Sequence, residues 1–200
     1  MKGWRPLTAE EVKRVSQSFG ATYGKRNKAL FVLGVRSGFR IFELLSLRVS
    51  DVLQHGNVVE HVTVQRRHMK KKTEGCTVPL HPEARAALSV WLDQLARTLK
   101  GTMSPETPVF CSRVRNADDT RWPLTREQAW RLLEEAFAAN ELTGQLGTHS
   151  MRKTFADRMY EKLNRDLVKV QRALGHRNIN STVSYLSFRE EDIAAAILAA

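Results

Sequence analysis

The sequence predicts a mainly α-helical domain that carries a small antiparallel β-sheet, an α+β fold. Apolar residues recur at helical spacing along most of the 200 residues, whereas only two short segments have the β-branched, alternating character of strands. Apolar residues make up 42% of the chain and charged residues 26%, which is typical of a globular protein with a core. The chain has no internal repeat, low-complexity tract or long linker, so we expect one compact domain.

The N-terminal part of the chain contains three predicted helices. The run TAEE at residues 8–11 is a capping box, in which the threonine hydroxyl accepts from the third helical N–H and the last glutamate reaches back, so a helix should run to about residue 19. A second helix is expected over residues 24–37 and should end at Gly38, because glycine favours the left-handed conformation that closes helices. A third helix fits residues 40–47.

A basic hairpin follows these helices. Residues 58–65 are β-branched and roughly alternating, and residues 77–80 form a second short strand. Between them lies the run RRHMKKKTEG, whose glycine suits a turn, so we expect an antiparallel hairpin with a cationic tip. Further helices are predicted over residues 84–99, after the capping motif TREQ at residues 125–128, and over residues 149–163, 166–174, 180–186 and 190–199.

The charge composition indicates a polyanionic partner. Lys and Arg number 32 against 21 Asp and Glu, so the formal net charge is +11, and the pI is near 10.1; both favour nucleic-acid binding. No apolar run approaches the ~20 residues that span a bilayer, and no signal peptide is evident, so no membrane partner is expected. Cys76 and Cys111 are expected to be reduced packing residues, and no Cys/His spacing resembles a metal site.

The first candidate site residue is Arg40, in the run RSGFRIFELL. Gly38 ends one predicted helix and Arg40 begins the next, so the guanidinium joins the partly positive end of a helix, where an anion can bind. Glu43 lies three residues further on and could brace Arg40 through an ion pair. Taken alone, a surface arginine in a helical ion pair explains this pattern more simply.

Two further patterns lie nearer the C-terminus. His149 and Arg152 are three residues apart and share one face of a predicted helix, although such a pair also arises by chance. Gly175 would end the preceding helix and place His176 just beyond the turn, with Tyr185 nine residues later on a short polar helix. Taken alone, His176 is explained as a helix-end cap and Tyr185 as a core residue.

The order of these residues along the chain resembles the tyrosine recombinase and phage integrase family. The stretch GFRIFELL looks like the first-arginine motif of that family, HSMR at residues 149–152 looks like its His-x-x-Arg motif, and LGH at residues 174–176 with Tyr185 looks like its closing motif. The match runs from about Thr8 to Ser187 and covers the catalytic domain of the family. The resemblance implies the tyrosine recombinase catalytic-domain fold and a site-specific DNA recombinase that forms a 3′-phosphotyrosyl intermediate without metal, ATP or another cofactor.

These residue types suit the cleavage of a DNA phosphodiester. Arg40 and Arg152 stay protonated and can bind the non-bridging oxygens of the phosphate in a bidentate manner, and His176 can donate a third hydrogen bond. Tyr185 is the expected nucleophile, because nearby cations stabilise a phenolate. A lysine crowded by other cations releases a proton more readily and can supply it to the departing 5′ oxygen.

The resemblance implies roles for further residues. His149 is implied as a general base or as a support for the tyrosine and the phosphate, and Glu43 as a support for the first arginine. The family places its proton-donating lysine several residues before a Val-Pro pair, and counting back from that pair here favours Lys71, with Lys72 next and Lys70 adjacent. The hairpin residues expected to contact DNA are Arg66, Arg67, Lys70 and Lys72.

The resemblance also sets expectations for organisation and partners. Residues 1–187 should form a single catalytic domain without the N-terminal core-binding domain that most members carry, and residues 188–200 a tail helix. The tail is expected either to dock on a neighbouring subunit or to pack on its own domain. The expected partner is double-stranded DNA, bound by a homotetramer on paired sites, and the protein without DNA should be monomeric or weakly associated. A bacterial or phage-encoded protein in the cytoplasm, at the nucleoid, is expected.

Two other functions stay open from the sequence alone. A type IB topoisomerase-like DNA strand transferase shares the chemistry but does not pair two sites, and the complete His-x-x-Arg and Leu-Gly-His motifs favour the recombinase. A non-catalytic DNA-binding regulator of the same fold would keep the cations, with Tyr185 serving only in packing. A covalent adduct with DNA separates the regulator from both enzymes.

Overall fold

A computed structural model describes residues 4–20, 22–64, 76–100, 102–115, 121–186 and 197–198, and it divides the chain into two compact units. The first unit is Met1–Phe155 and the second is Ala156–Ala200, so the boundary falls inside helix α7 (Thr148–Lys162). Helices dominate the described residues and the strands are short and antiparallel, which confirms the predicted fold class.

Six helices precede α7 in the part of the chain that the structure describes. They are α1 (Ala9–Ser18), α2 (Gly24–Ser37), α3 (Ile41–Leu45), α4 (Val49–Val52), α5 (Pro82–Thr98) and α6 (Arg126–Ala139). The predicted capping box of α1 is present, because the Thr8 hydroxyl accepts from the backbone of Glu11 at 3.1 Å and the Glu11 carboxylate accepts from the backbone of Thr8 at 2.8 Å. None of the described helices is long and apolar enough to cross a membrane.

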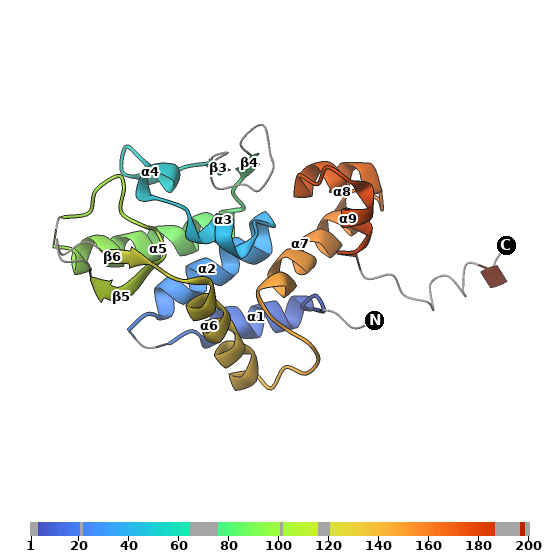
Figure 1. The fold of residues 1–200 in the computed structure, drawn as a ribbon, viewed down its shortest axis with the longest axis horizontal. Helices are drawn as coiled ribbons and strands as arrows, with labels where there is room; N and C mark the ends of the chain where they lie inside the picture. Colours follow the sequence, from blue (N-terminus) through green and yellow to red (C-terminus); the bar gives the residue numbers. More distant parts are fainter. Residues whose placement is uncertain are drawn as a thin grey trace. The chain divides into compact units, whose positions relative to one another are not determined.

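Helix α2 lies at the centre of the core of the first unit. Leu30, Phe31, Val32 and Leu33 are consecutive and all fully buried, so every face of the helix is covered. Helix α5 packs along α2, and α1 and α3 also contact it (Figure 1). Cys111 is buried in the same core, as predicted for a packing residue, whereas the side chain of Cys76 lies outside the described residues.

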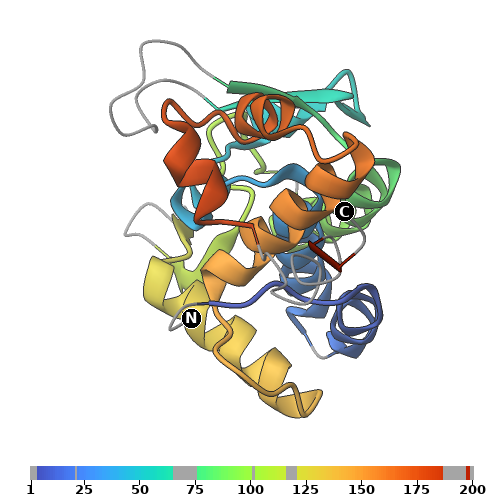
Figure 2. The same cartoon turned by 90° about the vertical axis from the view of Figure 1, so that its right-hand side faces the viewer.

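The strands pair as three separate two-stranded antiparallel sheets among the described residues. In the predicted hairpin, β3 (His61–Val64) pairs with β4 (Cys76–Pro79) and places Val62 opposite Val78, which confirms the expected antiparallel pairing. In both views this sheet lies on one side of the first unit, with α1 and α6 on the opposite side (Figure 1 and Figure 2). The other pairs are β1 (Leu53–Gln54) with β2 (Asn57–Val58) and β5 (Cys111–Arg115) with β6 (Arg121–Pro123).

The second unit contains the end of α7, α8 (Leu167–Leu174) and α9 (Ile179–Val183), and α8 packs against α9. Helix α8 ends at Gly175 with φ of +60°, as predicted. The helix predicted over residues 180–186 is shorter than expected, because Tyr185 lies in a turn that follows α9. The tyrosine is therefore held by turn geometry and not by a helix.

The predicted tail helix over residues 190–199 is only partly described. Ile197 and Leu198 are 71% and 89% exposed. The rest of that segment lies outside the described residues, so the choice between docking on a neighbouring subunit and packing on its own domain stays a prediction.

Candidate active site

The turn between α2 and α3 positions Arg40. Helix α2 ends at Gly38, whose φ of +67° is in the left-handed region. A side chain at this position would overlap the ring of Phe155, so both the backbone angle and the available space require glycine. Arg40 follows in extended backbone as the residue that begins α3, where the sequence predicted it.

Glu43 is buried next to Arg40 and holds it at two points. One carboxylate oxygen accepts from the Arg40 backbone N–H at 2.7 Å, and the other accepts from the guanidinium Nη1 at 3.1 Å. Because only 2% of Glu43 is exposed, its charge depends on these partners for stabilisation. The ion pair that the spacing predicted is therefore present, and it fixes both the backbone and the side chain of Arg40.

Helix α7 supplies His149 and Arg152. Arg152 is buried, and its Nη1 donates to the carbonyl oxygen of Gly38, 114 residues away in the sequence. The first turns of α7 also pack closely on α2, since a Cβ added to Gly34 would lie 2.6 Å from the sulfur of Met151. These contacts bring the His-x-x-Arg motif onto the turn that carries the first arginine.

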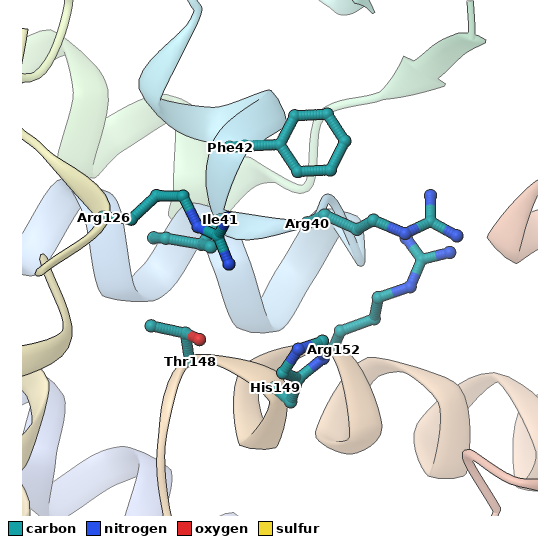
Figure 3. Close-up of a pocket in the computed structure, with 7 residues that line it drawn as sticks. All are labelled: Arg40, Ile41, Phe42, Arg126, Thr148, His149 and Arg152. Atoms are coloured by element: carbon teal, nitrogen blue, oxygen red, sulfur yellow. The ribbon is translucent and has the colours of Figure 1, made fainter. Parts of the chain in front are cut away.

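Arg40, His149 and Arg152 line one cavity of about 240 Å³ together with Arg126 (Figure 3). The remaining lining residues are Ile41, Phe42 and Thr148. Three guanidinium groups face this space, and the carboxylate nearby, Glu43, is already bonded to Arg40. A cavity with this excess of positive charge and these planar donors can bind an anion such as a phosphate group.

The cavity lowers the pKa of His149. Loss of hydration is the main cause, and the positive charges of Arg152, Arg40 and Arg126 add to it, with a smaller effect of Lys153. The imidazole is therefore neutral near pH 7 and has a nitrogen lone pair that can accept a proton.

Arg126 belongs to this cavity, although no sequence motif identified it as a site residue. It is the first residue of α6, directly after the Thr125 cap, and it is exposed. A cation in the first turn of a helix opposes the helix dipole, which favours acidic residues there. That unfavourable placement is the signal in the sequence that could have singled Arg126 out.

His176 and Tyr185 form a second cluster, within the second unit. Their ring centroids are 5.3 Å apart and the ring planes are tilted by 54°. His176 is buried, and its Nδ1 lies 3.0 Å from the hydroxyl of Thr182. The backbone N–H of Tyr185 donates to the carbonyl of Thr182 at 3.0 Å, so the closing motif forms one compact group of side chains.

The cationic hairpin residues of the predicted site lie outside the described residues. They are Arg66, Arg67, Lys70, Lys71 and Lys72. The assignment of Lys71 as the proton donor and of the others as DNA contacts therefore stays a prediction.

Comparison with known proteins identifies relatives along nearly the whole chain. The model of the phage integrase family matches residues 5–191. The probable integrase/recombinase YoeC of Bacillus subtilis (strain 168) is 30% identical over 187 residues, which cover 94% of this chain and 91% of that protein. The type 1 fimbriae regulatory protein FimE of Escherichia coli (strain K12) is 31% identical over 186 residues, covering 90% of this chain and 84% of that protein.

Solved structures of recombinases share the fold. The XerH site-specific recombinase, bound to a palindromic difH substrate in a post-cleavage complex, superposes with a TM-score of 0.71 at 26% identity and covers 96% of this chain and 51% of its own. The XerA recombinase has a TM-score of 0.72 at 21% identity, covering 96% of this chain and 63% of its own. This chain thus spans only part of the length of these two proteins. The chain belongs to the phage integrase family, and its described residues adopt the fold of a tyrosine recombinase catalytic domain.

Proposed function

We propose that this chain is a site-specific DNA recombinase of the integrase and invertase type, which cleaves and rejoins DNA strands through a 3′-phosphotyrosyl intermediate on Tyr185. The convergence of Arg40, His149 and Arg152 on one cavity carries the proposal. Like charges from distant parts of the chain repel one another, so packing alone gives no reason to gather them around an open space. A DNA phosphate supplies the negative charge that makes this arrangement favourable.

The proposed cleavage step forms one bond and breaks another at the same phosphorus atom. The Tyr185 oxygen attacks the phosphorus, and the bond to the 5′ oxygen breaks. Arg40 and Arg152 bind the non-bridging oxygens, on which negative charge grows in the transition state, and His176 donates a third hydrogen bond. The 5′ hydroxyl of a second strand then attacks the phosphotyrosyl bond and restores a phosphodiester, so no ATP is needed.

Two proton transfers accompany cleavage in this proposal. His149 accepts the phenolic proton, and its lowered pKa keeps it neutral for that role. Lys71 gives a proton to the departing 5′ oxygen. Lys71→Ala should therefore be rescued by a substrate with a 5′-bridging sulfur, which leaves without a proton. If Lys72→Ala is rescued instead, the proton donor is Lys72.

Covalent trapping tests the proposal for a target site of any sequence. The chain is incubated with a pool of nicked duplexes of randomised sequence, and denaturing electrophoresis retains only covalently attached DNA for sequencing. The unaltered protein should form an adduct and Tyr185→Phe should form none. An adduct with Tyr185→Phe would identify another nucleophile, and no adduct from any duplex contradicts the proposal and favours the DNA-binding regulator.

The assembly on DNA separates the recombinase from a type IB topoisomerase-like enzyme. We propose a homotetramer on two paired sites, with a monomeric or weakly associated protein in the absence of DNA, and residues 1–187 acting as one catalytic domain. Sedimentation with the selected duplex should give four protein copies with two duplexes. Relaxation of a supercoiled plasmid without pairing or strand exchange would favour the topoisomerase. The relatives named above come from bacteria, and we propose a site of action on bacterial DNA, at the nucleoid.

A further inference from the structure

We propose that Arg126 binds a phosphate of the DNA backbone adjacent to the phosphate that Arg40 and Arg152 hold. The inference rests on the proposed function, because it requires a DNA strand that passes through the cavity. It adds a DNA-binding residue that lies outside the motifs from which the site was predicted.

The first observation is the place of Arg126 in the cavity. It reaches the cavity from α6, whereas Arg40 comes from the start of α3 and Arg152 from α7. Figure 3 shows its guanidinium beside Ile41, on the other side of His149 from the guanidinium groups of Arg40 and Arg152. Arg126 is therefore placed for a second anionic group and not for the oxygens of the same phosphate. A DNA strand presents such groups in succession along its backbone.

The second observation is that the described residues give Arg126 no partner. It takes part in no ion pair and donates no side-chain hydrogen bond within the part of the chain that the structure describes. Arg131 on the same helix differs, because it pairs with Glu127 at 2.5 Å. The residues three and four positions after Arg126 are Ala129 and Trp130, which carry no carboxylate.

The third observation is electrostatic. A cation at the first position of α6 opposes the helix dipole, and it adds to the positive charge of the two arginines across the cavity. The effect of Arg126 on the pKa of His149 shows that its charge is felt inside the cavity. All of these interactions are unfavourable in the protein without ligand and become favourable when an anion enters.

Salt-dependent DNA binding tests the inference without requiring cleavage. The affinity of the chain for a duplex of about 30 base pairs and arbitrary sequence is measured by fluorescence anisotropy over a range of salt concentrations. Arg126→Ala should lower the slope of log affinity against log salt by about one, because one phosphate contact is lost. Arg131→Ala is the matched control on the same helix and should keep the unaltered slope. Equal slopes for the unaltered chain and Arg126→Ala, or equal losses in both variants, would overturn the inference.

Removal of single phosphate charges tests which phosphate is bound. Each phosphate near the cleavage position of the trapped duplex is replaced in turn by an uncharged methylphosphonate. At the adjacent position the replacement should slow cleavage by the unaltered chain but have no further effect on Arg126→Ala. Independent losses at every position would overturn the inference. If no duplex is cleaved, the proposed function fails, and the salt dependence still decides whether Arg126 binds DNA.

A stability measurement separates this role from a structural one. Because Arg126 is exposed and opposes the helix dipole, Arg126→Ala should melt at or slightly above the temperature of the unaltered chain. A clear fall in melting temperature, in parallel with the loss of DNA affinity, would show that Arg126 supports the fold and would overturn the inference.

Discussion

The hydroxyl of Thr182 lies 3.0 Å from Nδ1 of His176. Thr182 is fully buried, and its carbonyl accepts the backbone N–H of Tyr185 at 3.0 Å, so one residue holds both members of the cluster. When the hydroxyl donates to Nδ1, the neutral imidazole carries its proton on Nε2. That form of His176 is the one that can donate a hydrogen bond to a phosphate oxygen.

Thr182→Val should therefore slow adduct formation by about tenfold, the equivalent of one hydrogen bond of ~1.4 kcal/mol. The substitution removes the hydroxyl and keeps the branched shape, whereas Thr182→Ser keeps the hydroxyl and should stay close to the unaltered rate. Single-turnover cleavage of the selected duplex measures both variants. An unchanged rate for Thr182→Val would show that the hydroxyl does not orient His176.

Glu43→Gln should lower the free energy of unfolding by about 1–3 kcal/mol, because it replaces a buried charge that two donors of Arg40 stabilise. Urea denaturation measures the change. Glu127→Gln is the control, since the Glu127 side chain is 70% exposed and its pairing with Arg131 contributes only ~0.5 kcal/mol. A loss for Glu43→Gln as small as for the control would contradict a stabilising role of the buried pair.

The pKa of His149 in the folded protein should lie below its usual value of 6.5, as an NMR titration of the imidazole can measure. As pH falls, the unfolded chain binds this proton first, so the contribution of His149 to stability is present above pH 6.5 and is lost as pH falls through the folded pKa. A saturating short duplex brings phosphate charge into the cavity and should raise the pKa. No rise with bound duplex would argue against phosphate binding beside His149.

Gly38→Ala should destabilise the protein by more than Gly56→Ala, a comparison that isolates the packing at the turn before Arg40. Both glycines have positive φ, +67° and +78°, so alanine strains the backbone at each by about 1–2 kcal/mol. Only at Gly38 would the added carbon also meet the Phe155 ring, since nothing lies within 4 Å of it at Gly56. Chemical denaturation of the two variants gives the difference, and equal losses would mean that the ring yields easily.

Arg40→Ala and Arg152→Ala should each lower covalent adduct formation by about 10²–10³-fold, the effect of losing one donor to a developing oxyanion. Binding in a gel shift should stay largely intact, because many other phosphate contacts support affinity. A loss of binding in parallel with cleavage would contradict a specific role in the transition state.

The helix ends were predictable because each depends on residues only a few positions apart. The box formed by Thr8 and Glu11 and the left-handed glycines Gly38 and Gly175 are local signals, and the structure confirms them. The pairing of β5 with β6 was not predicted. Strand β6 has three residues and includes Pro123, so its strand character comes from its partner and not from its own composition.

The identity of the site residues was easier to predict than their contacts. Spacing alone predicted the pairing of Arg40 with Glu43, because both lie on one helical turn. The bond from Arg152 to Gly38 and the place of Arg126 in the cavity depend on how distant elements pack, and no local pattern reports that. The turn position of Tyr185 differs from the predicted helix for the same reason, since Thr182 holds it there.

The hydrogen bond from Arg152 to Gly38 has a consequence for the choice of an inactive variant. A substitution at Arg152 also withdraws a donor from the turn that orients Arg40, so its phenotype combines two losses and the double variant with Arg40 should show epistasis. Tyr185→Phe removes one hydroxyl and leaves that turn alone. It is therefore the cleaner starting point for capturing an uncut complex with DNA.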